Sequence, residues 1–303
     1  MEGGGPLRVL VLGAGGRLGG MLRRHWGTGA GAGLVGVDLV GADLAPLWQM
    51  RGAVEGPGVV RFDPLGRWPA LGRVDMVICL AGVIAGDAAA LRVNTDLALA
   101  AVRQGARCGA ARVFLASTAA VYGRGGAGLA EDDPVVPVSR YGQAKRAMEL
   151  AALAAGDEAG VPVTVLRIGN VAGADALLGG LAQGWVGQGR VGRGPVVLDR
   201  FADGQGPRRS YIGPGGFAAA MAGLARAAGA GCEVPACLNL ALPGAVAMAD
   251  LLQAAGVAFD WRAAPAGTLP LVELDVGRLL RLVPLERARA GAIVAEWRGA
   301  AAV

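Results

Sequence analysis

A tyrosine and a lysine four residues apart have the types and the spacing needed for proton transfer. Tyr141 precedes Lys145, which is the only lysine in a chain of 303 residues. Residues four apart lie on one face of a helix, one turn from each other. A nearby ammonium favours the phenolate and lowers the pKa of a tyrosine from ~10 toward neutral pH. We therefore expect a general acid–base for an alcohol-to-carbonyl step. A chance pair on a solvated helix is a poor explanation, because lysine occurs only once.

Two hydroxyl side chains stand where such a pair would need them. Ser117 and Thr118 directly follow the apolar run Val113–Ala116, which has the pattern of a buried strand. Ligands bind at the carboxyl ends of parallel strands in open α/β sheets. Thr118 is expected to hydrogen-bond the reacting oxygen, and Ser117 is the rival for that role.

A glycine-rich segment near the N-terminus is typical of a phosphate-binding turn. The apolar run Leu7–Leu12 leads into Gly13-Ala14-Gly15-Gly16-Arg17-Leu18-Gly19. Glycine permits a tight turn and a close approach of the backbone to a pyrophosphate, and the following helix N-terminus attracts its negative charge. The motif is weak on its own in a chain with 53 glycines.

Two aspartates strengthen the interpretation of this turn as a dinucleotide site. Asp38 closes the apolar run Leu34–Val37, and Asp63 follows the run that begins at Val59. A carboxylate at the end of the second strand accepts hydrogen bonds from the adenosine ribose and repels a 2′-phosphate, so Asp38 favours NAD over NADP. Asp63 is expected to reach the adenine amino group. The alternative for each is an ordinary turn or cap residue.

The composition excludes several other functions. A single histidine, His25, rules out a multi-histidine metal site and makes a serine–histidine–acid hydrolase an unfavourable hypothesis. The four cysteines form no Cys-x-x-Cys pair, so no metal is expected. The net charge is +5, but the arginines are dispersed, which argues against nucleic acid. With no signal peptide and no long apolar span, we expect a soluble cytoplasmic protein that does not enter a membrane.

The order of apolar and helical segments predicts the fold class. Apolar runs alternate with helical patterns over Ala88–Arg107 and Ser139–Ala155, and a further strand is expected at Val163–Ile168. This alternation indicates an α/β protein with a doubly wound parallel sheet of the NAD-binding Rossmann type. The expected division is an NAD-binding domain at 1–168, with 205–235 packed on it. A small discontinuous substrate region is expected at 169–204 and 236–303.

Taken together, these motifs resemble the extended short-chain dehydrogenase/reductases, the NAD-dependent epimerase/dehydratase family. The glycine turn, Asp38, the Ser117–Gly123 segment and the Tyr141-x-x-x-Lys145 pair all match that family, over most of the chain. The resemblance implies Thr118, Tyr141 and Lys145 as catalytic residues and NAD as cofactor. Residues expected to bind the cofactor are Gly13, Gly15, Gly16, Arg17, Leu18, Gly19, Asp38, Asp63, Ala81, Gly82, Asn94, Ser117, Tyr141 and Lys145. Residues expected to bind the substrate are Ser117, Thr118, Tyr141, Asn170 and Arg209.

The same resemblance leaves the substrate open. Asn170 and Arg209 match family positions that contact a nucleotide-sugar diphosphate, which favours a nucleotide-sugar epimerase. The short substrate region favours the alternative, a net dehydrogenase or reductase of a smaller sugar, sugar acid or other hydroxy compound. A third possibility is a non-catalytic NAD-binding sensor or scaffold. Ala119 and Ala120 stand where sugar dehydratases carry an acid pair, which disfavours dehydration. Relatives of this kind imply a homodimer formed through the helices Ala88–Arg107 and Ser139–Ala155.

Overall fold

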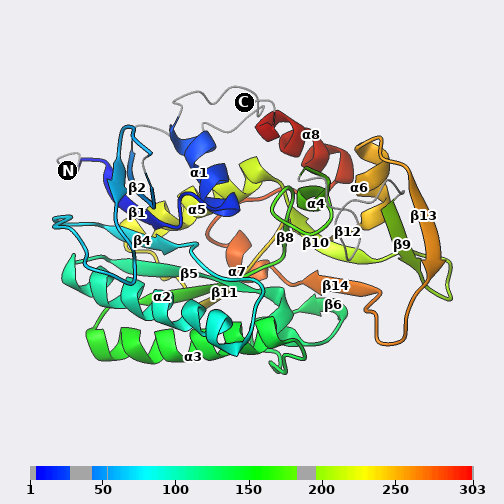
Figure 1. Ribbon diagram of the computed structural model, residues 1–303, viewed down its shortest axis with the longest axis horizontal. Coiled ribbons are helices and arrows are strands. Elements are labelled where there is room, and N and C mark those ends of the chain that lie inside the picture. The colour runs from blue at the N-terminus through cyan, green and yellow to red at the C-terminus, as the bar shows by residue number, and fades with distance from the viewer. Residues whose placement is uncertain (1–4, 28–42, 53, 183–195, 302–303) are drawn as a thin grey trace.

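A seven-stranded parallel sheet forms the centre of the molecule (Figure 1). The structure is a computed structural model that describes residues 5–27, 43–52, 54–182 and 196–301. In spatial order the strands are β11 (Cys237–Leu240), β7 (Val163–Ile168), β5 (Arg112–Thr118), β4 (Met76–Cys79), β1 (Leu7–Leu12), β2 (Leu44–Met50) and β3 (Val59–Arg61). Every neighbouring pair is parallel. The predicted doubly wound α/β fold is therefore confirmed.

Helices cover both faces of this sheet. α2 (Ala88–Arg107) and α3 (Arg140–Ala159) pack together below it in Figure 1, while α1 (Arg17–Gly27) and α5 (Pro214–Gly229) lie above it. Both long helices have side-chain caps, because Asp87 accepts from Ala90 N at the start of α2 and Ser139 accepts from Gly142 N at the start of α3. α3 continues beyond the expected Ala155 and ends at Gly160, whose φ of 66° suits glycine.

The strand beside β1 differs from the one that the sequence predicts. Leu34–Val37 lies outside the described residues, and β2 at Leu44–Met50 occupies the position between β1 and β3. This segment contains Pro46, which disfavours an interior strand. Trp48 N donates to Gly58 O, on the β3 side of β2. Backbone N–H groups two residues apart in a strand point to the same side, so the Pro46 nitrogen also faces β3. Pairing between β2 and β3 begins only at Trp48, so no partner needs an N–H at Pro46. The proline therefore interrupts no ladder.

The C-terminal half adds smaller sheets to one end of the main sheet. β12 (Ala245–Ala247), β10 (Arg208–Ile212), β14 (Leu271–Leu274) and β6 (Gly126–Leu129) form one sheet, with β8 (Asn170–Val171) paired to β10. β9 (Val196–Arg200) pairs with β13 (Phe259–Ala263). The remaining helices are η1 (Ala119–Tyr122), α4 (Leu178–Ala182), α6 (Met248–Ala254), α7 (Gly277–Leu280) and α8 (Ala290–Ala301).

The expected domain boundary at residue 236 does not follow this architecture. β11 lies in the main sheet beside β7, so the segment from 236 onward first completes the sheet and only then enters the smaller region. β6, from the first half of the chain, joins the sheet of the second half. The two parts of the molecule therefore exchange strands rather than meet at a linker.

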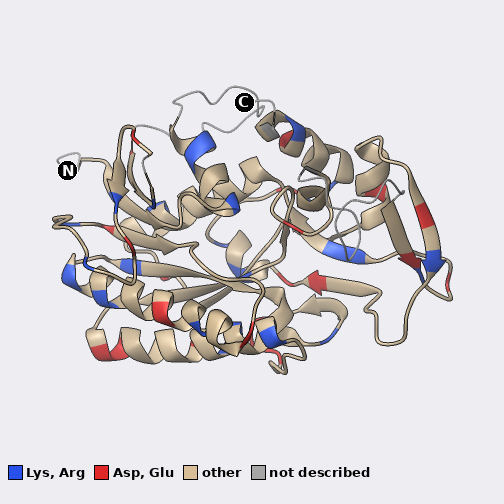
Figure 2. Ribbon diagram, viewed as in Figure 1, with Lys and Arg blue, Asp and Glu red and all other residues tan. Residues whose placement is uncertain are grey.

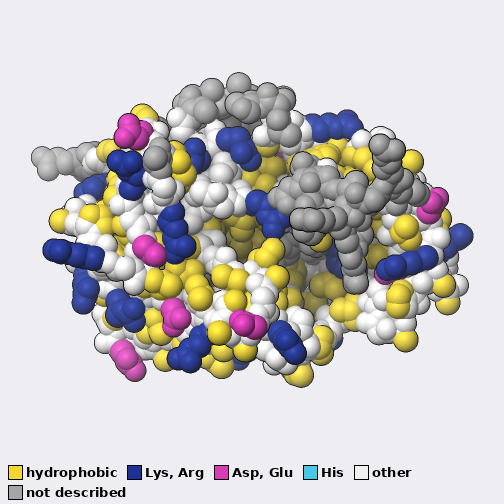
Figure 3. All heavy atoms as spheres, viewed as in Figure 1, with side chains coloured by type: hydrophobic (Ala, Val, Ile, Leu, Met, Phe, Trp, Pro, Cys, Tyr) yellow, Lys and Arg dark blue, Asp and Glu magenta, His cyan; other side chains and the backbone are white. Residues whose placement is uncertain are grey.

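Charged side chains are spread over both layers of the molecule. Figure 2 shows basic residues on α1, α2, α3 and the smaller sheets, with acidic residues among them. On the face in Figure 3 the basic side chains are separated by hydrophobic and neutral atoms. Within the described residues, no helix is long and apolar enough to cross a membrane.

Candidate active site

The turn between β1 and α1 lines a cavity, and two of its glycines have no room for a side chain. Gly13 has φ +81°, and a Cβ placed on it would lie 2.5 Å from Ala81 N. A Cβ on Gly19 would lie 2.3 Å from Gly13 O, so this glycine serves close packing between turn and helix. Gly19 is absent from the cavity lining, whereas Gly13, Gly15 and Gly16 line it. The turn thus fits the backbone cradle of a dinucleotide pyrophosphate.

A cavity of about 820 Å³ opens at the carboxyl ends of the central strands. It brings together residues that the sequence predicts from six separate segments of the chain. They are Gly13, Gly15, Gly16, Arg17, Leu18, Ala81, Gly82, Asn94, Ser117, Thr118, Tyr141, Lys145 and Asn170. The predicted cofactor and catalytic residues therefore share one site.

Lys145 is buried with its ammonium held by the protein. Its Nζ donates to Ala116 O at 2.8 Å and lies 3.8 Å from Met148 Sδ. Burial lowers the pKa of Lys145 to about 8, and the partial opposing effects come from Cys79 and Glu149. A lysine with this pKa changes charge close to neutral pH, which suits a group that assists proton transfer.

Tyr141 does not have the lowered pKa that its spacing from Lys145 predicts. Burial raises the pKa of Tyr141, and a hydrogen bond with the Thr118 side chain opposes the rise. The ammonium of Lys145 is directed at Ala116 O instead. The reason is desolvation, which disfavours the phenolate and which the sequence spacing does not reveal. The Tyr141–Thr118 contact does bring the two expected catalytic hydroxyls together.

Asn94 shapes the wall of the cavity beside Lys145. Its side chain accepts from Val83 N at 3.1 Å and donates to Val83 O at 2.9 Å and to Leu91 O at 2.8 Å. A Cβ on Gly82 would lie 2.7 Å from Asn94 Oδ1 and 3.3 Å from Lys145 Nζ. Asn94 therefore fixes the loop after β4 against Lys145.

A buried ion pair lies next to Ser117 and one turn of α3 beyond Lys145. Glu149, one turn after Lys145 on α3, accepts from Ser117 Oγ at 2.6 Å and pairs with Arg167 of β7 at 3.1 Å. Both charged side chains are almost completely buried. Sequence reasoning missed this pair. The available signal was the position of Glu149, on the helix face that also carries Tyr141 and Lys145.

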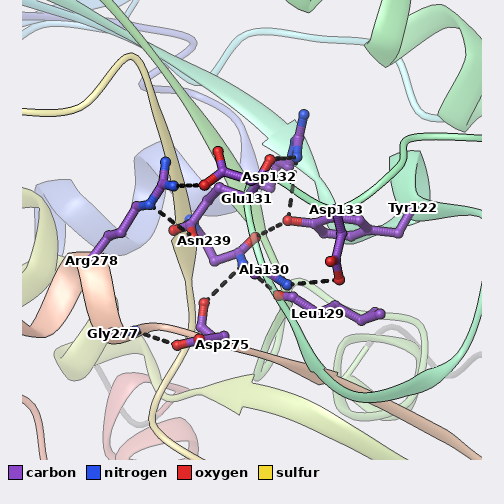
Figure 4. A network of polar contacts seen from close by, with 11 residues as sticks. Tyr122, Leu129, Ala130, Glu131, Asp132, Asp133, Asn239, Asp275, Gly277 and Arg278 are labelled. Atoms are coloured by element: carbon purple, nitrogen blue, oxygen red, sulfur yellow. Dashed lines mark hydrogen bonds and ion pairs between the residues drawn. The ribbon is translucent and has the colours of Figure 1, made fainter.

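The ion pair continues into a polar network that joins the two parts of the molecule (Figure 4). Arg167 donates to Tyr122 Oη at 3.3 Å and to Glu131 O at 3.0 Å. Tyr122 donates to Asn239 Oδ1 at 2.7 Å. Asn239 in turn donates to Leu129 O and to Asp275 O. Tyr122 is thus a buried hydrogen-bonding residue that contacts β7 through Arg167 and β11 through Asn239.

Among the described residues, Asp63 and Arg209 are predicted ligands that, like Gly19, do not line the cavity. Asp38 lies outside the described residues. Asp63 is exposed and pairs with Arg51 at 2.7 Å. The Arg209 guanidinium donates to the carbonyl oxygens of Arg208, Leu269 and Pro270, so backbone acceptors hold its Nη1 and Nη2 groups in place. The sequence places Arg209 on a family segment but does not show in which direction its side chain points.

The cavity also contains residues that the sequence interpretation did not select. Gln49 and Arg51 come from the end of β2. Asp175 accepts a hydrogen bond from Tyr211 at 2.8 Å and caps the turn that leads into α4. The burial of Tyr211 beside this carboxylate raises the pKa of its phenol well above the usual value.

Comparisons with known proteins agree with this geometry. Residues 9–212 match the model of the NAD dependent epimerase/dehydratase family. A UDP-glucose 4-epimerase of Azospirillum brasilense is 33% identical over 175 residues, which are 55% of this chain and 50% of that protein. The match thus spans about half the length of that relative.

Solved structures share the whole fold at low sequence identity. A UDP-galactose 4-epimerase has a TM-score of 0.72 at 20% identity and covers 98% of this chain and 99% of its own. MoeE5 in complex with UDP-glucuronic acid and NAD has a TM-score of 0.68 at 21% identity, covering 97% and 99%. The UDP-glucose 4-epimerase of Brucella ovis in complex with NAD has a TM-score of 0.71 at 18% identity, covering 96% and 97%.

The fold and the site define an enzyme of the extended short-chain dehydrogenase/reductase type. The chain belongs to the NAD-dependent epimerase/dehydratase family. NAD is the cofactor of this family, and the glycine cradle described above fits it.

Proposed function

We propose that the protein is an NAD-dependent epimerase that acts on a hydroxyl group of a nucleotide sugar. The observation that carries the proposal is the meeting of Thr118, Tyr141 and Lys145 with the glycine turn in one cavity. A glycine cradle alone would suit a cofactor-binding scaffold. The catalytic hydroxyls beside it are expected only in an enzyme that moves a proton.

In this mechanism the chain's own residues handle the proton. Tyr141 takes the proton of the substrate hydroxyl onto its phenolic oxygen, and Thr118 holds the same substrate oxygen. This step needs the phenolate, which burial alone disfavours, so the positive charge of Lys145 has to offset part of that cost. Lys145 provides a positive charge nearby and binds the nicotinamide ribose. When bound, NAD supplies the acceptor for the hydride that leaves the carbon bearing the hydroxyl. Tyr141 returns its proton after the keto sugar has turned over and has been reduced on its other face.

The alternative is a net dehydrogenase or reductase of a smaller sugar, sugar acid or other hydroxy compound. It uses the same catalytic residues, but the ketone leaves. One observation favours it, because Arg209, expected to hold the diphosphate, donates to backbone carbonyls. A catalytically silent sensor is disfavoured by the Tyr141–Thr118 contact.

The first experiment separates these functions. The purified protein is denatured and the released NAD is assayed, while the intact protein receives UDP-glucose or UDP-galactose. We expect retained NAD and interconversion of the two sugars with no net NADH at 340 nm. If the protein retains no NAD and does not interconvert the two sugars, the epimerase is rejected. The next search would then be for a dehydrogenase supplied with added NAD.

A Tyr141→Phe variant tests the catalytic assignment. We expect turnover to fall by about 10²–10⁴-fold, the range for loss of a general acid–base. Binding of NADH should be retained, and this measurement is the control for folding. Turnover equal to that of the wild type would refute the role of Tyr141.

We further propose a homodimer in the cytoplasm. α2 and α3 pack together on the outer face of the sheet, and Leu150 of α3 is exposed there. All four cysteines are unpaired, as expected where thiols stay reduced. Size-exclusion chromatography with light scattering measures the mass of the protein in solution. The Leu150→Asp variant should shift the equilibrium from the dimer toward the monomer. A monomeric wild-type protein would reject the dimer.

A further inference from the structure

The carboxyl end of β2 has the wrong charge for a site that accepts only NAD. In doubly wound folds, this strand end faces the adenosine ribose, where an acid binds the 2′-hydroxyl and an arginine accommodates a 2′-phosphate. Here the strand ends in Gln49 and Met50, and Arg51 follows. None of these residues is acidic, and Gln49 and Arg51 line the cavity.

Gln49 and Met50 fix the position of this strand end against the glycine turn. Gln49 is buried, accepts from Gly13 N at 2.9 Å and donates to Phe62 O at 2.7 Å. A Cβ on Gly15 would lie 3.5 Å from Met50 Cε. The residue that follows, Arg51, therefore starts from a rigid point beside the turn.

Arg51 has donors left for an anion. Its side chain is 64% exposed, and one nitrogen, Nη2, pairs with Asp63 Oδ1. A guanidinium carries five N–H donors in a planar fork, so the others remain for phosphate oxygens. The Asp63 carboxylate also accepts from Leu65 N at 3.0 Å, and these contacts lower its pKa and partly neutralise its charge.

The described lining of the cavity adds positive charge, and Asp63, the carboxylate paired with Arg51, lies outside this lining. Arg17, in the glycine turn, lines the same cavity. Among the described lining residues Asp175 is the only acid, and it is committed to Tyr211 and to the backbone of the α4 turn. The carboxylate that would repel a 2′-phosphate is therefore missing from the described wall.

We propose that Arg51 binds the 2′-phosphate of an adenosine ribose, so that the protein binds NADP(H) in addition to NAD(H). The phosphate would take the free N–H donors of Arg51 while Nη2 keeps Asp63, and Arg17 supplies a second positive charge. The inference rests on the dinucleotide cavity and not on the identity of the sugar.

The test measures binding, with no substrate present. Isothermal titration gives the Kd values of NADH, NADPH, 5′-AMP and adenosine 2′,5′-bisphosphate for the wild type. We expect NADPH to bind within about tenfold of NADH or more tightly, and the bisphosphate to bind more tightly than AMP. Loss of this preference at high salt would follow from the exposure of Arg51.

Variants assign the effect to one side chain. Arg51→Gln should weaken NADPH and the bisphosphate by about 10- to 100-fold, the range for a charged hydrogen bond, and change NADH by less than about threefold. Arg61→Gln is the matched control, because this exposed arginine of β3 pairs with Glu55 and does not line the cavity. The control should leave all four Kd values unchanged.

Two outcomes would overturn the proposal. NADPH binding far weaker than NADH in the wild type, with Asp38→Asn restoring it, would assign the choice to Asp38 instead. Equal losses of NADH and NADPH in Arg51→Gln would make Arg51 a structural residue. Failure of the sugar assays affects neither measurement, so the two proposals fail separately.

Discussion

Replacing Lys145 by methionine should make the protein more stable at neutral pH. Under the proposed function, the same replacement should abolish catalysis. The wild type holds a buried ammonium whose pKa has fallen from 10.5 to about 8. At about 1.4 kcal/mol per pH unit, this difference corresponds to about 3 kcal/mol of destabilisation below pH 8. Methionine fills a similar space without charge, but it leaves Ala116 O without its donor, at a cost of about 1 kcal/mol. The variant should therefore be more stable by about 2 kcal/mol at pH 7.

The pH dependence identifies the cause. The unfolded chain keeps the Lys145 proton up to about pH 10.5, whereas the folded protein releases it near pH 8. Between these values the unfolded state binds more protons, so this residue makes wild-type stability rise with pH. Buried thiols such as Cys79, whose pKa is raised to about 11, act in the opposite direction. Thiols that do not interact with Lys145, such as Cys237, cancel in the difference. The Cys79 thiol does not cancel fully, because Lys145→Met removes an ammonium that lowers its pKa.

The assay is urea denaturation of the cofactor-free protein from pH 7 to pH 10.5. The advantage of Lys145→Met should shrink above pH 8 and reverse to about 0.5 kcal/mol in favour of the wild type near pH 10.5, where half of the unfolded chains still hold the Lys145 proton. Arg140→Met, at an exposed position of the same helix, is the control and should show no such pH dependence. A variant that is less stable than the wild type at pH 7, or a difference that is constant with pH, would refute the reasoning.

Three further substitutions test other contacts. Glu149→Gln should lower the free energy of unfolding by about 3–5 kcal/mol, because Arg167 would lose its buried partner; an unchanged denaturation midpoint would contradict this. Gly13→Ala should abolish NADH binding in a fluorescence titration, because the new methyl group would meet Ala81 N; retained binding would show that the turn adapts. Arg209→Gln should lower the melting temperature and leave the KM for a nucleotide sugar within about threefold, whereas a large rise in KM at unchanged stability would restore Arg209 as a diphosphate ligand.

The parts of the fold that depend on local sequence could be predicted. The segment Leu7–Leu12 and its glycine turn carry their own strand and turn signals, and α2 has the bounds Ala88–Arg107 that its pattern predicts. Tyr141 and Lys145 both line the cavity, because they lie one turn apart on the same face of α3. These features need no information from distant residues.

Features set by distant partners could not be predicted in the same way. β2 is a strand despite Pro46, because the pairing of β2 with β3 begins only at Trp48 and requires no backbone N–H at position 46. The Glu149–Arg167 pair requires α3 and β7 to pack, and the pKa of Tyr141 depends on how deeply that packing buries it. Arg209 lies on a predicted segment, but the loop at Leu269 decides where its guanidinium goes.

The composition of the chain gives the buried lysine a practical consequence. Since Lys145 is the only lysine, the chain has a single ε-amine, and it lies in the cavity. Amine-selective acylating reagents can therefore modify just the N-terminal amine and Lys145. With a pKa of about 8, a substantial fraction of this amine is unprotonated and nucleophilic at mildly alkaline pH. Acetylation of Lys145 would remove its charge from the cavity, and labelling that a dinucleotide blocks would report occupancy of the site.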